Sequence, residues 1–140
     1  METTRVLLGS VGVAHLIVVV MNFYLPARIE LGANLAKVSP MVRQMTIVHH
    51  VYIVGVILVF AGLCFSFAPD LAGGSALGRA GAAAMSLFWL ARIPIQLFYY
   101  DRGTRRRHPA IDAGFLVLVA YMAAVLGIAA LGALRPGGAL

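Results

Sequence analysis

The chain has 140 residues, of which 61% are hydrophobic and only 11% are charged. A soluble domain usually carries about a quarter charged residues, so this composition excludes an ordinary soluble domain. The formal net charge is +6, and the basic run "RGTRRRHP" is short; we expect it to meet lipid headgroups and expect no nucleic-acid partner.

The apolar residues gather in four blocks, which follow one another at about residues 6–25, 44–68, 79–100 and 112–134. Each block matches the roughly twenty residues that a helix needs to cross a hydrocarbon core of about 30 Å. We therefore expect an all-α integral membrane protein with the lipid bilayer as its surroundings. Its four transmembrane helices should form one up-down-up-down bundle, a single domain over residues 1–140.

Short connections join the blocks, and the basic residues are divided unequally between them. The connections after the first and third blocks should face the same side, and they carry Arg28, Lys37, Arg43, Arg102, Arg105, Arg106 and Arg107. The opposite side has only Arg5, Arg79 and Arg135. Because excess Lys and Arg mark the cytoplasmic side, we expect a multi-pass protein of the cell inner membrane with both termini outside. The longest connection, "PARIELGANLAKVSP", is expected to lie along the interface as a short amphipathic piece.

Histidines interrupt the first two blocks. His15 lies in the first block and shares a helical face with Asn22, seven residues on. The second block contains the stretch "VHHVY", in which His49 and Tyr52 share a face while His50 points about 100° away. We expect His49 to face a site inside the bundle and His50 to bond an adjacent helix or a partner.

The third block carries a polar stripe, because Trp89, Arg92, Gln96 and Tyr99 follow helical spacing. Pro94 lies within the stripe and should bend the helix, since proline cannot donate a hydrogen bond to the carbonyl four residues before it. An arginine in mid-membrane costs between about 2.5 and 17 kcal/mol, so Arg92 should face the bundle interior. Its partner could be a bound anionic or carbonyl-bearing ligand, several neutral acceptors, or another subunit.

Counting residues from the expected cytoplasmic ends predicts that these side chains converge. At about 1.5 Å per residue, His15 lies about 15 Å deep, and His49 and His50 lie about 9 to 11 Å deep. Arg92, and Tyr121 of the fourth block, both lie about 13 to 14 Å deep. The four helices should therefore each offer a polar side chain at a similar level, somewhat on the cytoplasmic side of the midplane.

Two imidazoles on facing helices can ligate a b-type haem, so His15 with His49 or His50 is a candidate haem pair. Arg92 could then hold a propionate, with Gln96, Tyr121 and Tyr52 as further ligand-contacting groups. Zinc and di-iron sites fit less well, because the spans lack the carboxylates that such sites use with histidine.

The leading hypothesis is a redox-associated protein that holds haem b or interacts with a quinone in electron transfer. One alternative is a non-catalytic accessory or assembly subunit, whose polar residues bond a membrane protein partner or another copy of the chain. Another is a membrane enzyme acting on an amphipathic small molecule, for example an anionic amphipathic ligand. The sequence leaves open whether the protein is an enzyme.

Overall fold

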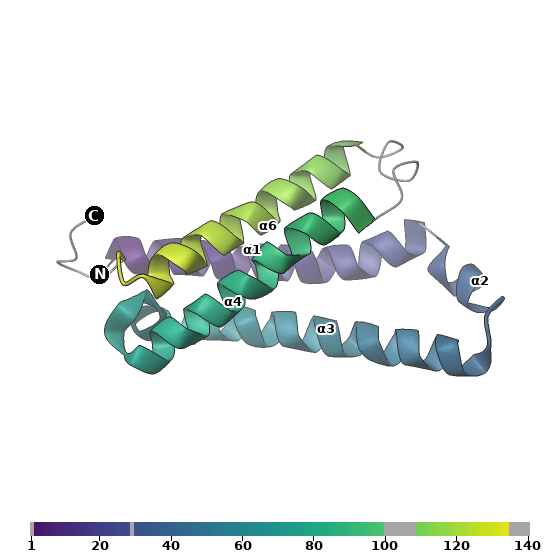
Figure 1. Ribbon diagram of the computed structural model, residues 1–140, viewed down its shortest axis with the longest axis horizontal. Coiled ribbons are helices and arrows are strands. Elements are labelled where there is room, and N and C mark those ends of the chain that lie inside the picture. Colours follow the sequence, from purple (N-terminus) through teal and green to yellow (C-terminus); the bar gives the residue numbers. More distant parts are fainter. Residues whose placement is uncertain (1, 29, 100–108, 135–140) are drawn as a thin grey trace.

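The computed structural model describes residues 2–28, 30–99 and 109–134, and these ranges are helical almost throughout (Figure 1). No strand occurs in them, and the predicted all-α fold is confirmed. The α-helices are α1 (Glu2–Arg28), α2 (Leu31–Leu35), α3 (Pro40–Ser66), α4 (Ala76–Pro94) and α6 (Pro109–Ala130). Two π-helical turns, η1 (Asp70–Gly74) and η2 (Ile95–Tyr99), lie before and after α4.

Four helical segments are long and apolar enough to cross a membrane: α1, α3, α4 continued by η2, and α6. They correspond to the four predicted blocks and are consistent with a multi-pass membrane protein. The helices begin three or four residues before their predicted spans, and α6 ends at Ala130 rather than at residue 134. Which membrane holds the chain, and which side each end faces, stay predictions; the arginine-rich connection at 102–107 lies outside the described residues.

Local sequence explains where the helices begin. Ser39 caps α3 by accepting a hydrogen bond from the amide of Val42, and Pro40 follows at the first helical position, where proline is well tolerated. Ser75 caps α4 in the same way, with its hydroxyl 2.9 Å from the amide nitrogen of Gly78. Each cap satisfies an amide that has no partner within its own helix.

The spans associate mainly as two pairs, α1 with α3 and α4 with α6, and α1 also contacts α6. In Figure 1 the α4–α6 pair is inclined to α3: α4 crosses α3 near the η1 end and diverges from it toward α2. The shared core is made of fully buried apolar side chains from the four spans, among them Leu8, Val11, Ile57, Met85, Trp89, Met122 and Leu126. The first half of α3, over residues 40–53, contains no buried residue and is the part of the four spans least covered by the rest of the described chain.

The sequence predicted a bend at Pro94, and the structure shows a change of helix type at this residue. The α-helix ends at this residue, and the wider π-helical turn η2 carries the chain on to Tyr99. Because a π-helical turn holds more residues than an α-helical one, it rotates the following side chains away from the predicted stripe. Trp89 is buried, Arg92 and Gln96 are half-buried, and Tyr99 is 83% exposed.

Candidate functional site: polar groups along the bundle

His15 is completely buried at the centre of the bundle, and both of its ring nitrogens have hydrogen-bond partners. The indole nitrogen of Trp89 donates to Nε2 over 3.0 Å, so Nε2 is an acceptor. Nδ1 lies 2.7 Å from the carbonyl oxygen of Val11, one turn earlier in α1, and must carry the proton of that bond. The surroundings therefore select the neutral tautomer protonated at Nδ1, and they leave no lone pair directed at a ligand.

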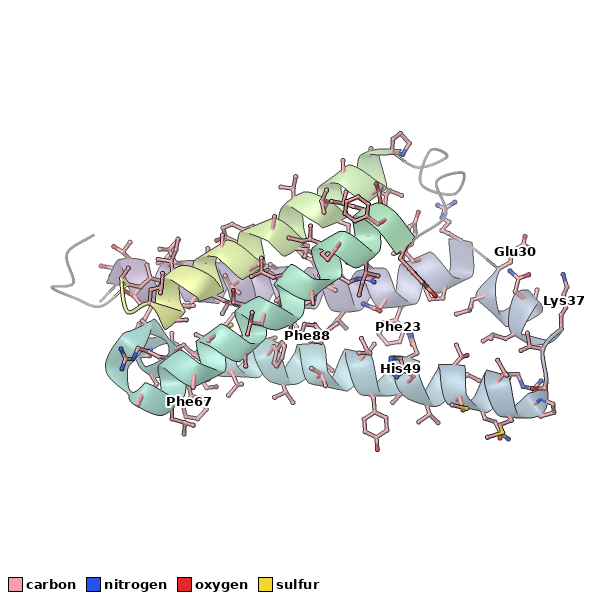
Figure 2. The ribbon with its side chains drawn as sticks, viewed as in Figure 1. Phe23, Glu30, Lys37, His49, Phe67 and Phe88 are labelled. Atoms are coloured by element: carbon pink, nitrogen blue, oxygen red, sulfur yellow. The ribbon has the colours of Figure 1, made fainter. Side chains whose placement is uncertain are left out.

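Aromatic rings surround this imidazole and join three helices. The His15 ring meets Phe60 of α3 edge to face at 5.9 Å and Trp89 of α4 at 5.4 Å, as measured between ring centroids. Phe88 of α4 also contacts α3, with centroids 5.3 Å from Phe60 and 5.1 Å from its neighbour Trp89. Figure 2 shows Phe88 where α4 crosses α3. The arrangement links α1, α3 and α4 at one level of the bundle, and we call these four residues the central cluster.

The histidine doublet lies elsewhere on α3. His50 is half-buried and meets Phe23 of α1 edge to face, with ring centroids 6.4 Å apart. His49 is exposed, and it shares a shallow, open depression on the surface of α3 with Tyr52, which is 71% exposed. The two neighbouring histidines thus point in different directions, as their 100° separation requires. His49 and Tyr52 face away from the bundle interior.

The structure does not bring His15 together with His49 or His50. His15 is level with Phe60, whereas His50 is level with Phe23, and His50 precedes Phe60 by ten residues of α3. At 1.5 Å per residue, the separation along the bundle is about 15 Å. In Figure 2, His49 and Phe23 correspondingly lie nearer to α2 than Phe88 does. The predicted pair of facing imidazoles is not assembled, and haem binding stays a prediction that no contact here supports.

Arg92 and Gln96 lie toward the η2 end of the bundle and face α6. The guanidinium carbon of Arg92 lies 5.6 Å from the centroid of the Phe115 ring, a distance at which a cation is attracted to the ring face. Four residues after Arg92, the Gln96 amide donates a hydrogen bond to the carboxylate of Asp112. These residues join η2 and the end of α4 to the beginning of α6.

Tyr121 lies toward the opposite end of the bundle. Its hydroxyl is 2.6 Å from the hydroxyl oxygen of Ser10 in α1. Because the Ser10 hydroxyl donates to the carbonyl of Leu7, Tyr121 must be the donor of this interhelical bond. The distance along α1 between Ser10 and Phe23 is about 20 Å, and Phe23 is the residue that contacts His50. The predicted site residues are therefore spread along the bundle instead of converging.

The interior polar groups of the described residues are all satisfied. Every buried side-chain nitrogen or oxygen among them has a hydrogen-bond partner, including the hydroxyl of Ser86, which donates to the carbonyl of Ala123 over 2.8 Å. Within the same residues, no group of three or more His, Cys, Asp or Glu is placed to hold a metal ion. The buried polar groups of the described bundle are therefore all used in hydrogen bonds, and those of Ser86 and Trp89 join two helices.

Sequence reasoning missed the partners in these bonds. Asp112 is the first residue of the fourth predicted block, and a carboxylate at the start of an apolar block is a signal that could have indicated its role. Phe60, Phe115 and Ser10 gave no signal, because apolar and small residues are expected throughout a membrane helix. Which of them meets a polar side chain depends on how far each helix is shifted along its neighbour.

Comparison with known proteins adds no assignment to this geometry: no protein-family model, curated protein or solved structure matches the chain. The class of protein that the helices define is a small polytopic membrane bundle, and its function must be argued from its own residues.

Proposed function

We propose that this chain is a non-catalytic assembly subunit that binds another transmembrane protein through α3. The observation that carries the proposal is a difference between the buried polar side chains and the exposed polar side chains of α3. The buried side chains of Trp89 and Ser86 bond other helices of the same chain, while His49 and Tyr52 project from an apolar helix with none of the described helices in front of them.

The interior contacts favour a structural use of the polar groups. The indole N–H of Trp89 donates a hydrogen bond to His15, and an amide N–H of Gln96 donates one to Asp112. A ligand that needed His15 would have to displace the Trp89 bond, and an unbonded indole N–H in a low-dielectric interior is unfavourable. Bonds of this kind hold membrane helices together, at about 0.6 kcal/mol on average and up to about 1.7 kcal/mol each.

The exposed surface of α3 favours an intermolecular use of His49 and Tyr52. Polar side chains that face hydrocarbon are expensive unless they reach water, headgroups or a protein partner. His49 lies about 14 Å along α3 from Pro40, and that helix is about 40 Å long, which exceeds a hydrocarbon core of about 30 Å. A partner helix lying along α3 would cover both side chains and supply acceptors or donors for them.

The redox and enzyme hypotheses require a different arrangement. Haem b would need two imidazoles opposite one another, and His15 and His50 are about 15 Å apart along the bundle. A quinone or an anionic amphiphile would need Arg92 or Gln96 turned toward it, whereas these side chains contact Phe115 and Asp112. No specific contact favours either hypothesis over assembly.

A photo-crosslinking amino acid placed at Tyr52, with the protein in its native membrane, tests the proposal. Matched controls carry it at Leu87 of α4 and Val117 of α6, which are 65% and 69% exposed. We expect adducts with a protein, identified by mass spectrometry, at Tyr52 and adducts with lipid at the two controls. Lipid adducts alone at Tyr52, together with stoichiometric haem or quinone in the purified protein, would replace assembly by the redox hypothesis.

A further inference from the structure

We infer that the partner of α3 is a second copy of this chain, docked through a parallel α3–α3 seam. The inference rests on the proposed assembly function and names the partner. The seam consists of the α3 residues spaced alternately four and three apart, all of them exposed: Met41, Met45, Val48, Tyr52, Gly55, Val59, Gly62 and Ser66.

The spacing of the seam is that of a helix-to-helix contact. Alternate steps of four and three residues give the 3.5-residue repeat by which two helices pack along their length. The large side chains of the seam are between 54% and 71% exposed, and the seam extends for about 37 Å from Met41 to Ser66. The residues that α3 buries within its own chain, Val54, Ile57, Ala61 and Cys64, form a separate stripe on the other side of the helix. A helix packed on both sides uses two such stripes.

Two glycines distinguish the seam from a surface that only faces lipid. A Cβ atom at Gly55 or Gly62 would meet nothing within 4 Å, so neither glycine is needed for packing inside the chain. Glycine lowers helix stability relative to alanine, and it offers lipid no better contact. Small residues on one face permit two membrane helix backbones to approach closely, and Gly55 and Gly62 lie two turns apart on the same stripe. Val59 lies between them on the same stripe.

The side chains that border the seam complement those of an identical helix. Two copies inserted in the same direction present parallel α3 helices related by a two-fold axis, with equal residues at equal depth. In a parallel pair of helices with this repeat, residues that border the seam on one helix face residues that border it on the other. A bordering residue directly before a seam position, at position i of one helix, lies opposite position i+5 of the other. Gln44 of one copy then lies opposite His49 of the other, an amide against an imidazole. The next such pairs are apolar, Val51 with Val56 and Leu58 with Leu63.

This pairing accounts for the exposed polar side chains. The amide of Gln44 can donate to or accept from the His49 ring, and the two-fold axis repeats the bond on the other side of the seam. Tyr52 lies within the seam itself, where the two rings would face each other. The exposed stripe of α6 differs, because Tyr121 within it already bonds Ser10 of α1, and α6 packs against both α4 and α1. Among the described spans, α3 has two open glycines, Gly55 and Gly62, whereas α1 and α6 have one each, Gly9 and Gly114.

Dilution in lipid vesicles tests the inference. The dimer fraction of fluorescently labelled protein, measured by energy transfer as the lipid-to-protein ratio rises, gives a dissociation constant. We expect Gly55→Leu and Gly62→Leu each to weaken association by about tenfold, equivalent to about 1.4 kcal/mol. The open space around both glycines means that the variants should keep the monomer fold. Gly114→Leu on α6, where the space is also open, is the matched control and should leave the dissociation constant unchanged.

Cysteine crosslinking identifies the face. In a Cys64→Ala background, single cysteines at Val48 and Val59 should form disulfides between copies, whereas equally exposed Val20, Leu87 and Val117 should not. A monomer at every lipid ratio would overturn the inference, and so would a dimer that is linked through Val117 and is insensitive to Gly55→Leu. If the photo-crosslinker at Tyr52 captures a different protein, the proposed assembly function is retained and the inference that the partner is a second copy of this chain is refuted.

Discussion

The hydrogen bond between Trp89 and His15 predicts a measurable coupling between α4 and α1. Trp89→Phe keeps an aromatic ring but removes the N–H that Nε2 of His15 accepts over 3.0 Å. His15→Leu keeps an apolar side chain but removes the acceptor from the indole. Each single variant leaves one buried polar group without its partner, because His15 is fully buried and Trp89 is 2% exposed. The double variant leaves neither.

The size of the effect can be worked from these contacts. Trp89→Phe loses an interhelical bond of about 0.6 to 1.7 kcal/mol and leaves space where the larger ring was, so we expect a loss of about 2 kcal/mol. His15→Leu also loses the bond to the Val11 carbonyl and the ring contact with Phe60, and a similar loss is expected. The double variant should be about 1 kcal/mol more stable than the sum of the two losses predicts.

Reversible unfolding in mixed micelles, with SDS as denaturant and far-UV ellipticity as the signal, measures all four free energies. A control cycle pairs Trp89→Phe with Tyr121→Phe, whose hydroxyl bonds Ser10 instead, and should be additive. Additivity within about 0.3 kcal/mol in the Trp89–His15 cycle would refute the reasoning. It would mean that the indole N–H and the imidazole find other partners in each variant, and that the central cluster does not depend on this bond.

Two further predictions concern the turn before α4 and the orientation of the chain. Gly78→Ala should destabilise the fold by about 1 to 3 kcal/mol in the same unfolding assay, because its Cβ would lie 2.1 Å from the backbone oxygen of Asp70. Gly81→Ala, whose Cβ would lie 3.7 Å from a leucine methyl group, should be neutral or stabilising, and equal effects of the two would contradict the close approach of η1 to α4. If the basic connections are cytoplasmic, a cysteine at Ala76 should react with an impermeant maleimide in intact cells and one at Lys37 only after permeabilisation. The reverse labelling would invert the orientation.

The division of the chain into membrane helices could be predicted from the sequence because it depends on local properties. An unbroken apolar block of some twenty residues has few alternatives to a helix in lipid, where the backbone must satisfy its own hydrogen bonds. The starts of α3 and α4 at Ser39 and Ser75 follow from capping within a few residues, and the end of α4 at Pro94 follows from the N–H that proline lacks. The different directions of His49 and His50 are equally local, since the helix itself sets the angle between neighbours.

The partners of the polar residues depended on the tertiary structure. Depths counted from the expected ends put His15 and the histidine doublet at similar levels, but α1 continues to Arg28, beyond the predicted end at Leu25. Contacts across the helix pair show the true offset, with His15 beside Phe60 and His50 beside Phe23. The shift of one helix along another is set by side-chain packing over the whole interface, here including Phe65 lying across Gly12. No pattern within a single helix contains that shift. The sequence by itself therefore determined which residues are helical and which are polar, and only the packing of α1 against α3 and α4 decided that His15 meets Trp89 while His49 faces outward.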